Sequence, residues 1–170
     1  MIKKKIEDIC NRQIEREGFS SILYIAMASW AENKGYPGIA LWLYSQAEEE
    51  KLHMLKFIKY INERGGKAII PAFKKPVAEF KSVENVFTEV LKHEEFITDS
   101  INEIVGLTLE EKDFNTNNFL QWFVFEQVEE ETSARTILDK VRLVGTNNMY
   151  QFDRDILSLR TPAANSQPAT

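Results

Sequence analysis

Four glutamates, one near the middle of each of four long helical segments, are the residues of this chain best placed to do chemistry. They are Glu17, Glu50, Glu94 and Glu130, and helical spacing puts each of them among core-type residues, although the row of Glu17 is more polar than the other three. A buried carboxylate without a partner costs several kcal/mol, so four of them at one level require positive charge between them. A single glutamate of this kind would be read as a helix-edge residue that reaches solvent. Four matched occurrences instead predict a buried centre that holds two metal ions.

A histidine follows the second glutamate at a spacing that suits joint metal binding. Glu50 and His53 are three residues apart, so both side chains lie on the same side of a helix and can hold one ion together. The fourth segment has Gln127 at the same spacing before Glu130, but no histidine. The two metal positions should therefore be unequal. We expect Glu17 and His53 at one ion, Glu94 and Glu130 at the other, and Glu50 as the bridge.

Oxygen-rich ligation with a single imidazole and no thiolate suits divalent iron or manganese better than zinc or copper(I). Carboxylate oxygens also stabilise ferric iron, so iron that cycles between its two states beside dioxygen would make this centre an oxidase. Tyr24 lies one helical row from Glu17. It either hydrogen-bonds a ligand or gives up an electron, or it is a core tyrosine with a satisfied hydroxyl group, and the sequence leaves these alternatives open.

A second acidic group consists of Glu49, Glu126 and Glu129. Each neighbours a predicted ligand in sequence but is rotated by about 100° around its helix. Spacing alone leaves two readings open, a solvated polar face and a third, more exposed metal site. His93 precedes Glu94 and faces away from the centre, so we expect it to be structural.

The elements that must position these residues are long helices, because glycine and proline interrupt the chain at few places. Helical periodicity predicts helices over about residues 5–33, 39–64, 82–109 and 116–144, and a short amphipathic segment over about residues 147–159. Short turns join the first helix to the second and the third to the fourth, so each of these two pairs should be an antiparallel hairpin. The linker over residues 67–81 can extend about 50 Å, enough to pass a 28-residue helix of about 42 Å. The sequence therefore predicts an all-α, up-down four-helix bundle with one long crossover and a short C-terminal fifth helix, which is the ferritin-like topology.

Length and composition set the remaining limits. At 170 residues and 19.7 kDa the chain suits one domain, expected over residues 1–160, and the polar segment at residues 161–170 is predicted to be disordered. A net charge of −5 disfavours nucleic acid as a partner. One cysteine, Cys10, cannot close an internal disulfide and favours a reducing compartment. No secretory signal follows the first residues, and no stretch approaches the length of about 18 apolar residues that a membrane span needs. We expect a cytoplasmic protein without a membrane anchor.

Several short motifs resemble those of bacterial non-haem ferritins, over about residues 5–160. The first motif is Glu17 with Phe19-Ser20-Ser21 and Tyr24, and the second is Glu-Glu-Glu-Lys-Leu-His-Met at residues 48–54. The third is Lys-His-Glu at residues 92–94, and the fourth runs from Asn118 to Glu131. Gly18 departs from the larger residue expected beside the first ligand, and we expect it to loosen that turn of the helix without removing a ligand.

The resemblance implies a ferroxidase centre and an iron-storing assembly. The implied centre is Glu17, Glu50, His53, Glu94, Gln127 and Glu130, with Gln127 as a near-site polar group. Two ferrous ions per chain would be oxidised there by dioxygen or hydrogen peroxide. A third iron site is implied at Glu49, Glu126, Glu129 and Glu130. About 24 chains would form a hollow shell around ferric mineral, and the segment at residues 147–159 fits such an assembly because a short amphipathic helix needs something to pack against.

Related families and other classes of protein remain as alternatives. Bacterioferritin has a second Glu-x-x-His and a haem-binding methionine directly after the second-helix glutamate, where this chain has Lys51, so we predict no haem. A di-iron oxidase or peroxide scavenger that stores no mineral would share the same centre. A metal-free helical interaction bundle is the alternative outside enzymology.

Overall fold

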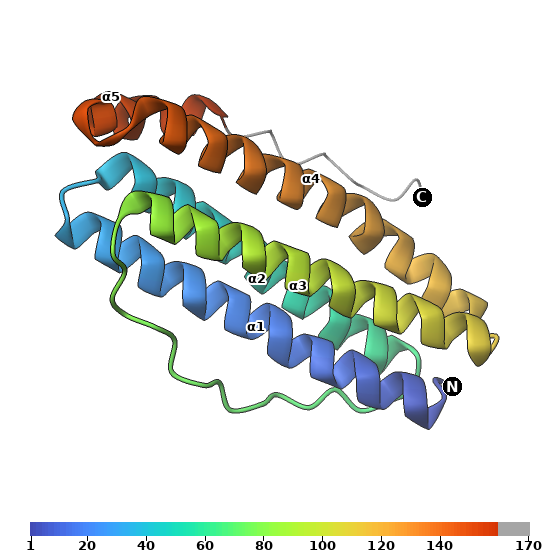
Figure 1. Ribbon diagram of the computed structural model, residues 1–170. Coiled ribbons are helices and arrows are strands. Elements are labelled where there is room, and N and C mark those ends of the chain that lie inside the picture. Colours follow the sequence, from blue (N-terminus) through green and yellow to red (C-terminus); the bar gives the residue numbers. More distant parts are fainter. Residues whose placement is uncertain (160–170) are drawn as a thin grey trace.

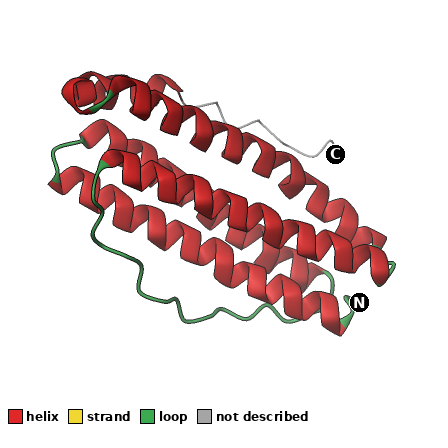
Figure 2. Ribbon diagram, viewed as in Figure 1, coloured by secondary structure: helices red, strands yellow, loops and turns green. Residues whose placement is uncertain are grey.

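The computed structural model describes residues 1–159, which form a bundle of four long helices with a short fifth helix at one end (Figure 1). The helices are α1 (Lys4–Asn33), α2 (Pro37–Glu63), α3 (Val83–Glu110), α4 (Phe114–Val144) and α5 (Met149–Asp155). Single 3-10 turns at Thr146–Asn148 and Ile156–Leu159 flank α5, and no strand occurs within these residues (Figure 2). The predicted fold class is confirmed. The predicted disordered tail lies outside the described residues, and the domain boundary at residue 160 stays a prediction.

The ends of the helices follow from local chemistry, which explains the small differences from the predicted bounds. Pro37 is the first residue of α2, where its fixed φ suits a helix and its missing N–H leaves no donor unsatisfied. Ser82 accepts a hydrogen bond from the Asn85 N–H at 3.1 Å and caps α3, as its type and position predict. Asp113 caps α4 in the same way, so this helix begins at Phe114 rather than at Thr116.

The long connection between α2 and α3 runs along the outside of α1 for the length of the bundle (Figure 1). Asn11 of α1 holds its first part: the amide group donates to the Lys67 carbonyl at 3.0 Å and accepts from the Ile69 N–H at 2.7 Å. Near its other end, Phe80 packs edge-on against Trp30 at 5.8 Å between ring centroids. Since the connection returns the chain to the starting end of α2, α2 and α3 run parallel and the midpoints of the four helices meet at one level.

The interior of the bundle contains two apolar clusters with a polar layer between them. One cluster, toward α5, includes Tyr24, Leu43, Val90 and Ile137, and the other, toward the N-terminus, includes Ile14, Phe57, Ile97 and Phe123. Along each long helix, the residues between the two clusters include one of the four predicted glutamates. The apolar packing on both sides therefore fixes the height at which these four side chains meet.

Helix α5 packs against its own chain. Phe152 and Ile156 are buried in the cluster toward α5, and the Asp153 carboxylate accepts a hydrogen bond from the Ile39 N–H at 2.8 Å, near the start of α2. A Cβ at Gly38 would lie 1.9 Å from the Asp153 carbonyl oxygen, so this approach requires glycine. The amphipathic segment does have a packing partner, but that partner is the end of the bundle itself. None of the described helices is long and apolar enough to cross a membrane.

Candidate metal centre

The polar layer of the bundle is built from all four long helices. Its members are Glu17 from α1, Glu50 and His53 from α2, Glu94 from α3, and Gln127 and Glu130 from α4. Every one of these side chains is buried, and Glu130 is the most exposed of them at 8%. The structure therefore brings together the six residues that the sequence pointed to, although whether they bind metal stays a prediction.

The first half of the layer contains a ready set of metal ligands. Glu17, Glu50 and His53 each offer one ligand atom, and these atoms all lie within 4.8 Å of one another. The His53 Nδ1 atom is 3.9 Å from Glu17 Oε2 and 3.7 Å from Glu50 Oε2, distances too long for hydrogen bonds. Glu17 Oε2 and both carboxylate oxygens of Glu50 are buried without any hydrogen-bond partner. Such atoms are costly to bury, and a cation between them would remove that cost.

The second half of the layer is held by hydrogen bonds from neighbouring side chains. The Tyr24 hydroxyl donates to Glu94 Oε1, and the Gln127 amide lies 3.4 Å from Glu94 Oε2. Glu130 Oε2 accepts from the Gln46 amide at 2.8 Å. Tyr24 is therefore a direct neighbour of a predicted ligand, whereas an electron-donating role for it stays a prediction.

Burial dominates the electrostatics of the four carboxyl groups. It raises the pKa of Glu17, Glu50 and Glu130 well above the usual value, and repulsion from neighbouring carboxylates adds to the shift. The pKa of Glu94 is also raised by burial, although the hydrogen bonds from Tyr24 and Gln127 oppose the shift. These shifts favour the protonated carboxyl groups in the absence of a cation, so a divalent ion that binds here competes with protons.

The donor set fits two hard, divalent ions. Four carboxylates and one imidazole surround the site, and the one cysteine, Cys10, is buried in the cluster toward the N-terminus. Such oxygen-rich ligation suits iron or manganese. The charge of Glu50 helps to raise the pKa of Glu17, and the charge of Glu94 helps to raise the pKa of Glu50, so Glu50 lies close to both carboxyl groups. This central position, with two unpaired oxygens, fits the bridging role predicted for it.

Two glutamines in the layer were missed by the reasoning from sequence. Gln13 donates to Glu17 Oε1 at 2.8 Å, and Gln46 donates to Glu130 Oε2 at the same distance. Both amides are buried and fix one oxygen of a predicted ligand. Each glutamine stands four residues before a glutamate of the layer, so the repeated Gln-x-x-x-Glu spacing was the available signal. That spacing could not show that Gln46 bonds to Glu130 of another helix.

The second acidic group lies beside the centre. Glu49 and Glu126 are half-buried, and Glu129 is exposed. The pKa of Glu126 is raised by burial and by repulsion from Glu129 and Glu49, so Glu126 lies close to both of the other carboxylates. A third metal site at these residues stays a prediction.

Aromatic residues surround the predicted imidazole ligand, while the other histidine points elsewhere. His53 packs edge-on against Trp122 at 5.3 Å and against Phe123 at 5.8 Å between ring centroids. The Nε2 atom of His93 lies 2.7 Å from the Ser20 hydroxyl, and burial lowers its pKa to about 4. His93 is thus a neutral packing residue in the contact between α1 and α3.

Gly18 plays a different part from the one expected. Helix α1 continues through it without a break. A Cβ at this position would lie 2.4 Å from the ring of Phe73 and 2.9 Å from the Met54 sulfur. The glycine does not loosen the helix; it makes room for an aromatic side chain of the crossover directly beside Glu17.

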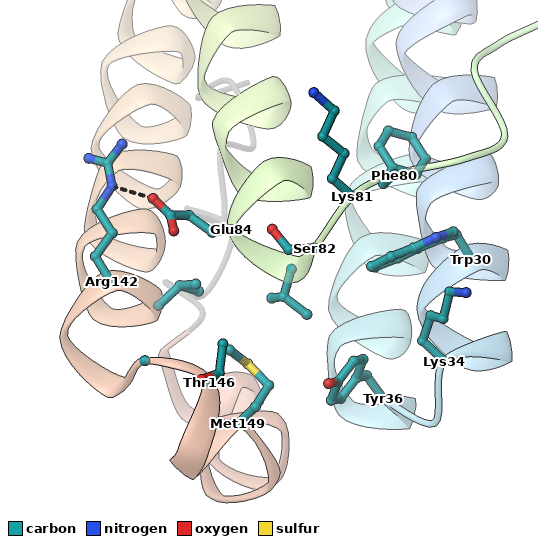
Figure 3. A pocket seen from close by; sticks show the side chains of 13 residues that line it. Trp30, Lys34, Tyr36, Phe80, Lys81, Ser82, Glu84, Arg142, Thr146 and Met149 are labelled. Atoms are coloured by element: carbon teal, nitrogen blue, oxygen red, sulfur yellow. Dashed lines mark hydrogen bonds and ion pairs between the residues drawn. The ribbon is translucent and has the colours of Figure 1, made fainter.

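A cavity of about 400 Å³ at the α5 end of the bundle has a different character (Figure 3). Trp30, Tyr36 and Phe80 line it together with Lys34 and Lys81. An ion pair between Arg142 and Glu84 closes one side, at 3.1 Å (Figure 3). None of the six residues of the polar layer lines this cavity, so it is separate from the candidate metal centre.

Comparisons with known proteins agree on one family. The ferritin-like domain matches residues 7–144. A bacterial non-haem ferritin-like protein of Haemophilus influenzae is 41% identical over 165 residues, which cover 96% of this chain and 100% of that protein. The bacterial non-haem ferritin of Campylobacter jejuni is 39% identical over 161 residues, covering 94% of this chain and 96% of that protein.

Solved structures give the same result. An open-pore ferritin from the archaeon Archaeoglobus fulgidus superposes with a TM-score of 0.90 at 41% identity and covers 94% of this chain and 98% of its own. A humanised archaeal ferritin superposes with a TM-score of 0.91 at 42% identity, covering 95% of this chain and 100% of its own.

Proposed function

The chain belongs to the ferritin family, and from this premise we propose that it is an iron-storage ferroxidase. Two ferrous ions would bind in the polar layer and be oxidised to the ferric state by dioxygen or hydrogen peroxide. The product would be stored as mineral inside a shell of 24 chains. The proposal includes a cytoplasmic location, as the sequence predicts.

The observation that carries this proposal is the set of unpaired buried oxygens at Glu17 and Glu50. A bundle that bound no cation would gain stability by replacing these carboxylates with apolar residues of similar size. The chain instead surrounds them with two more carboxylates and an imidazole, which is a donor set for two divalent cations. This arrangement counts against the metal-free interaction bundle.

The residues of the layer would bind the two ferrous ions in the following way. His53 and Glu17 hold one ferrous ion, Glu94 and Glu130 hold the other, and Glu50 lies between the ions. Gln13 and Gln46 orient Glu17 and Glu130, so each of these carboxylates keeps its other oxygen directed to metal. The protons that the carboxylates release on binding must leave the layer, because the ferrous ions take their place.

Two further roles belong to the same proposal. Glu49, Glu126 and Glu129, with Glu130, would hold a third iron next to the centre, since their mutual repulsion favours a cation there. Through its hydrogen bond to Glu94, Tyr24 would adjust the position of this carboxylate as the charge of the iron changes.

The test is aerobic addition of excess ferrous iron, followed by size-exclusion chromatography with iron and protein detected together. A storage ferritin gives many irons per chain in a particle of about 470 kDa, the mass of 24 chains of 19.7 kDa. Rapid oxidation with loss of iron from a small species would support the di-iron oxidase or peroxide scavenger instead. Absence of both binding and oxidation would refute the metal centre.

A further inference from the structure

The candidate metal centre is closed to solvent, so ferrous ions need a path to reach it. Its ligands are between 1% and 8% exposed. A cavity of about 270 Å³ lies between α3 and α4, and one of its walls is Gln127 of the polar layer. The cavity also contacts Thr98 of α3 and Glu131 of α4. It therefore extends from partly exposed side chains to the edge of the centre.

A continuous series of polar groups links the cavity to Glu94. Glu131 stands at its outer side with a side chain that is 24% exposed. The Thr98 hydroxyl donates to Glu131 Oε1 at 2.6 Å. The Gln127 amide lies 3.4 Å from the Thr98 oxygen and 3.4 Å from Glu94 Oε2, so it stands between the cavity and the predicted ligand.

The side chains along this series carry oxygen atoms of the kind that divalent iron binds. Glu131 supplies a carboxylate and Thr98 a hydroxyl, and Asn102 adds an amide oxygen to the cavity wall. Arg135 lies 3.3 Å from Glu131 Oε2, but its side chain is 53% exposed, so the ion pair is readily exchanged for water. The carboxylate can therefore turn to an incoming cation.

Gln127 is held far more loosely than the other two glutamines of the layer. Gln13 and Gln46 each donate to a carboxylate at 2.8 Å. The three contacts of the Gln127 amide, to the Glu94 carbonyl, to Glu94 Oε2 and to Thr98, are 3.3, 3.4 and 3.4 Å long. Bonds of this length are weak, so this amide can rotate at little cost while its two counterparts stay fixed.

We propose that the cavity between α3 and α4 is the route by which ferrous ions reach the centre, with Glu131 as a transient ligand and Gln127 as a rotating amide that admits them. This inference rests on the proposed function, because it supplies the access that a buried ferroxidase centre requires. The rival route passes through the acidic group of Glu49, Glu126 and Glu129, none of which lines this cavity. Substitution of Glu126 therefore tests the rival route, and substitution of Glu131 tests the proposed one.

The experiment measures binding rather than oxidation. Co(II) is mixed anaerobically with the intact assembled protein in a stopped-flow instrument, and the visible absorption of bound cobalt reports association. Glu131→Gln keeps the shape of the side chain and removes its charge, and it should slow association by about tenfold at low salt, the lower end of electrostatic steering. The equilibrium number of cobalt ions per chain should stay the same. Added salt should reduce the difference between the variant and the unaltered protein.

Three comparisons make the result decisive. Glu95→Gln removes one negative charge from an exposed position on α3 and should leave the rate unchanged. Thr98→Val removes the intermediate hydroxyl at nearly constant volume and should slow association as Glu131→Gln does. Glu126→Gln tests the rival route. The inference is overturned if Glu131→Gln binds cobalt as fast as Glu95→Gln, or if Glu126→Gln alone is slow. If the unaltered chain bound no cobalt at all, the proposed centre would fail, and the route to it with it.

Discussion

Glu50 differs from the other three carboxylates of the layer in the partners of its oxygens. Glu17, Glu94 and Glu130 each accept a hydrogen bond from a glutamine or tyrosine side chain, whereas neither oxygen of Glu50 has a donor. Its negative charge is thus the least compensated in the protein part of the site. Glu50 should therefore add little to the stability of the metal-free bundle. Among the four carboxylates, it should add the most to the stability of the metal-loaded bundle.

The first prediction separates these two states with Glu50→Gln. Without metal, the free energy of unfolding should be unchanged or higher, because the amide is neutral at every pH and needs no proton to be buried. With Co(II) at roughly one hundred times its Kd, the unaltered protein should gain about 2.7 kcal/mol from linkage, and the variant should lose most of that gain. Thermal unfolding with and without Co(II) measures both, and Glu15→Gln on the exposed face of α1 is the control. An equal metal-induced rise in Tm in the variant would contradict the bridging role.

The second prediction concerns pH in the absence of metal. An acid whose pKa is raised by folding stabilises the folded state below its unfolded pKa, and this stability is lost as pH rises through the folded pKa. Burial raises the pKa of Glu17, Glu50 and Glu130, so Tm should fall as the pH rises above about 6.5, where His93, whose pKa burial lowers to about 4, no longer adds an opposing slope. Glu50→Gln should flatten this slope. The carboxylates whose pKa is lowered, such as Asp113, lose their contribution at more acidic pH and do not mask the effect.

At the scale of elements, the helices and the level of the glutamates were predictable from sequence, because both depend on local periodicity. Contacts between distant segments were not. Asp153 caps the start of α2 across 114 residues of sequence, and no local pattern pairs it with Ile39. Phe73 belongs to a linker without periodicity, so the sequence does not predict its contact with Gly18. The prediction that this glycine loosens a turn of α1 is wrong for that reason.

The third prediction tests this contact between the crossover and α1. Gly18→Ala alone should change stability little, because about 1 kcal/mol of helix propensity is offset by displacement of Phe73. In a Phe73→Ala background the same change should stabilise by about 1 kcal/mol, since the ring is gone and the flexible Met54 side chain, whose sulfur would lie 2.9 Å from the new Cβ, can move into the freed space. Gly106→Ala is the matched control, because a Cβ at that position in α3 meets no atom within 4 Å. Equal effects of Gly18→Ala in both backgrounds would show that Phe73 does not occupy this space.

At the scale of the whole molecule, a single chain leaves apolar side chains uncovered outside the bundle. Leu41, Leu52 and Leu55 are 55%, 56% and 45% exposed, and their spacing of eleven and three residues places them on one face of α2. Phe125, 72% exposed, is an uncovered aromatic side chain on α4. Uncovered apolar side chains on two helices of one chain favour contacts with more than one neighbour, as a closed shell requires.

The fourth prediction follows from the stripe on α2. Replacing Leu52 and Leu55 together by lysine places two charges where a neighbouring chain would be packed, and burying them would cost several kcal/mol. The assembly should break into smaller species, measured by light scattering after size-exclusion chromatography. Glu95→Lys on α3 changes the net charge by the same amount outside the stripe and should leave the mass of the assembly unchanged.

The polar layer lies inside one bundle, so dispersed chains should still bind Co(II) while they fail to retain ferric iron. Full assembly of the double variant would place the contacts between chains elsewhere, and loss of cobalt binding on dispersal would show that the centre needs a neighbouring chain.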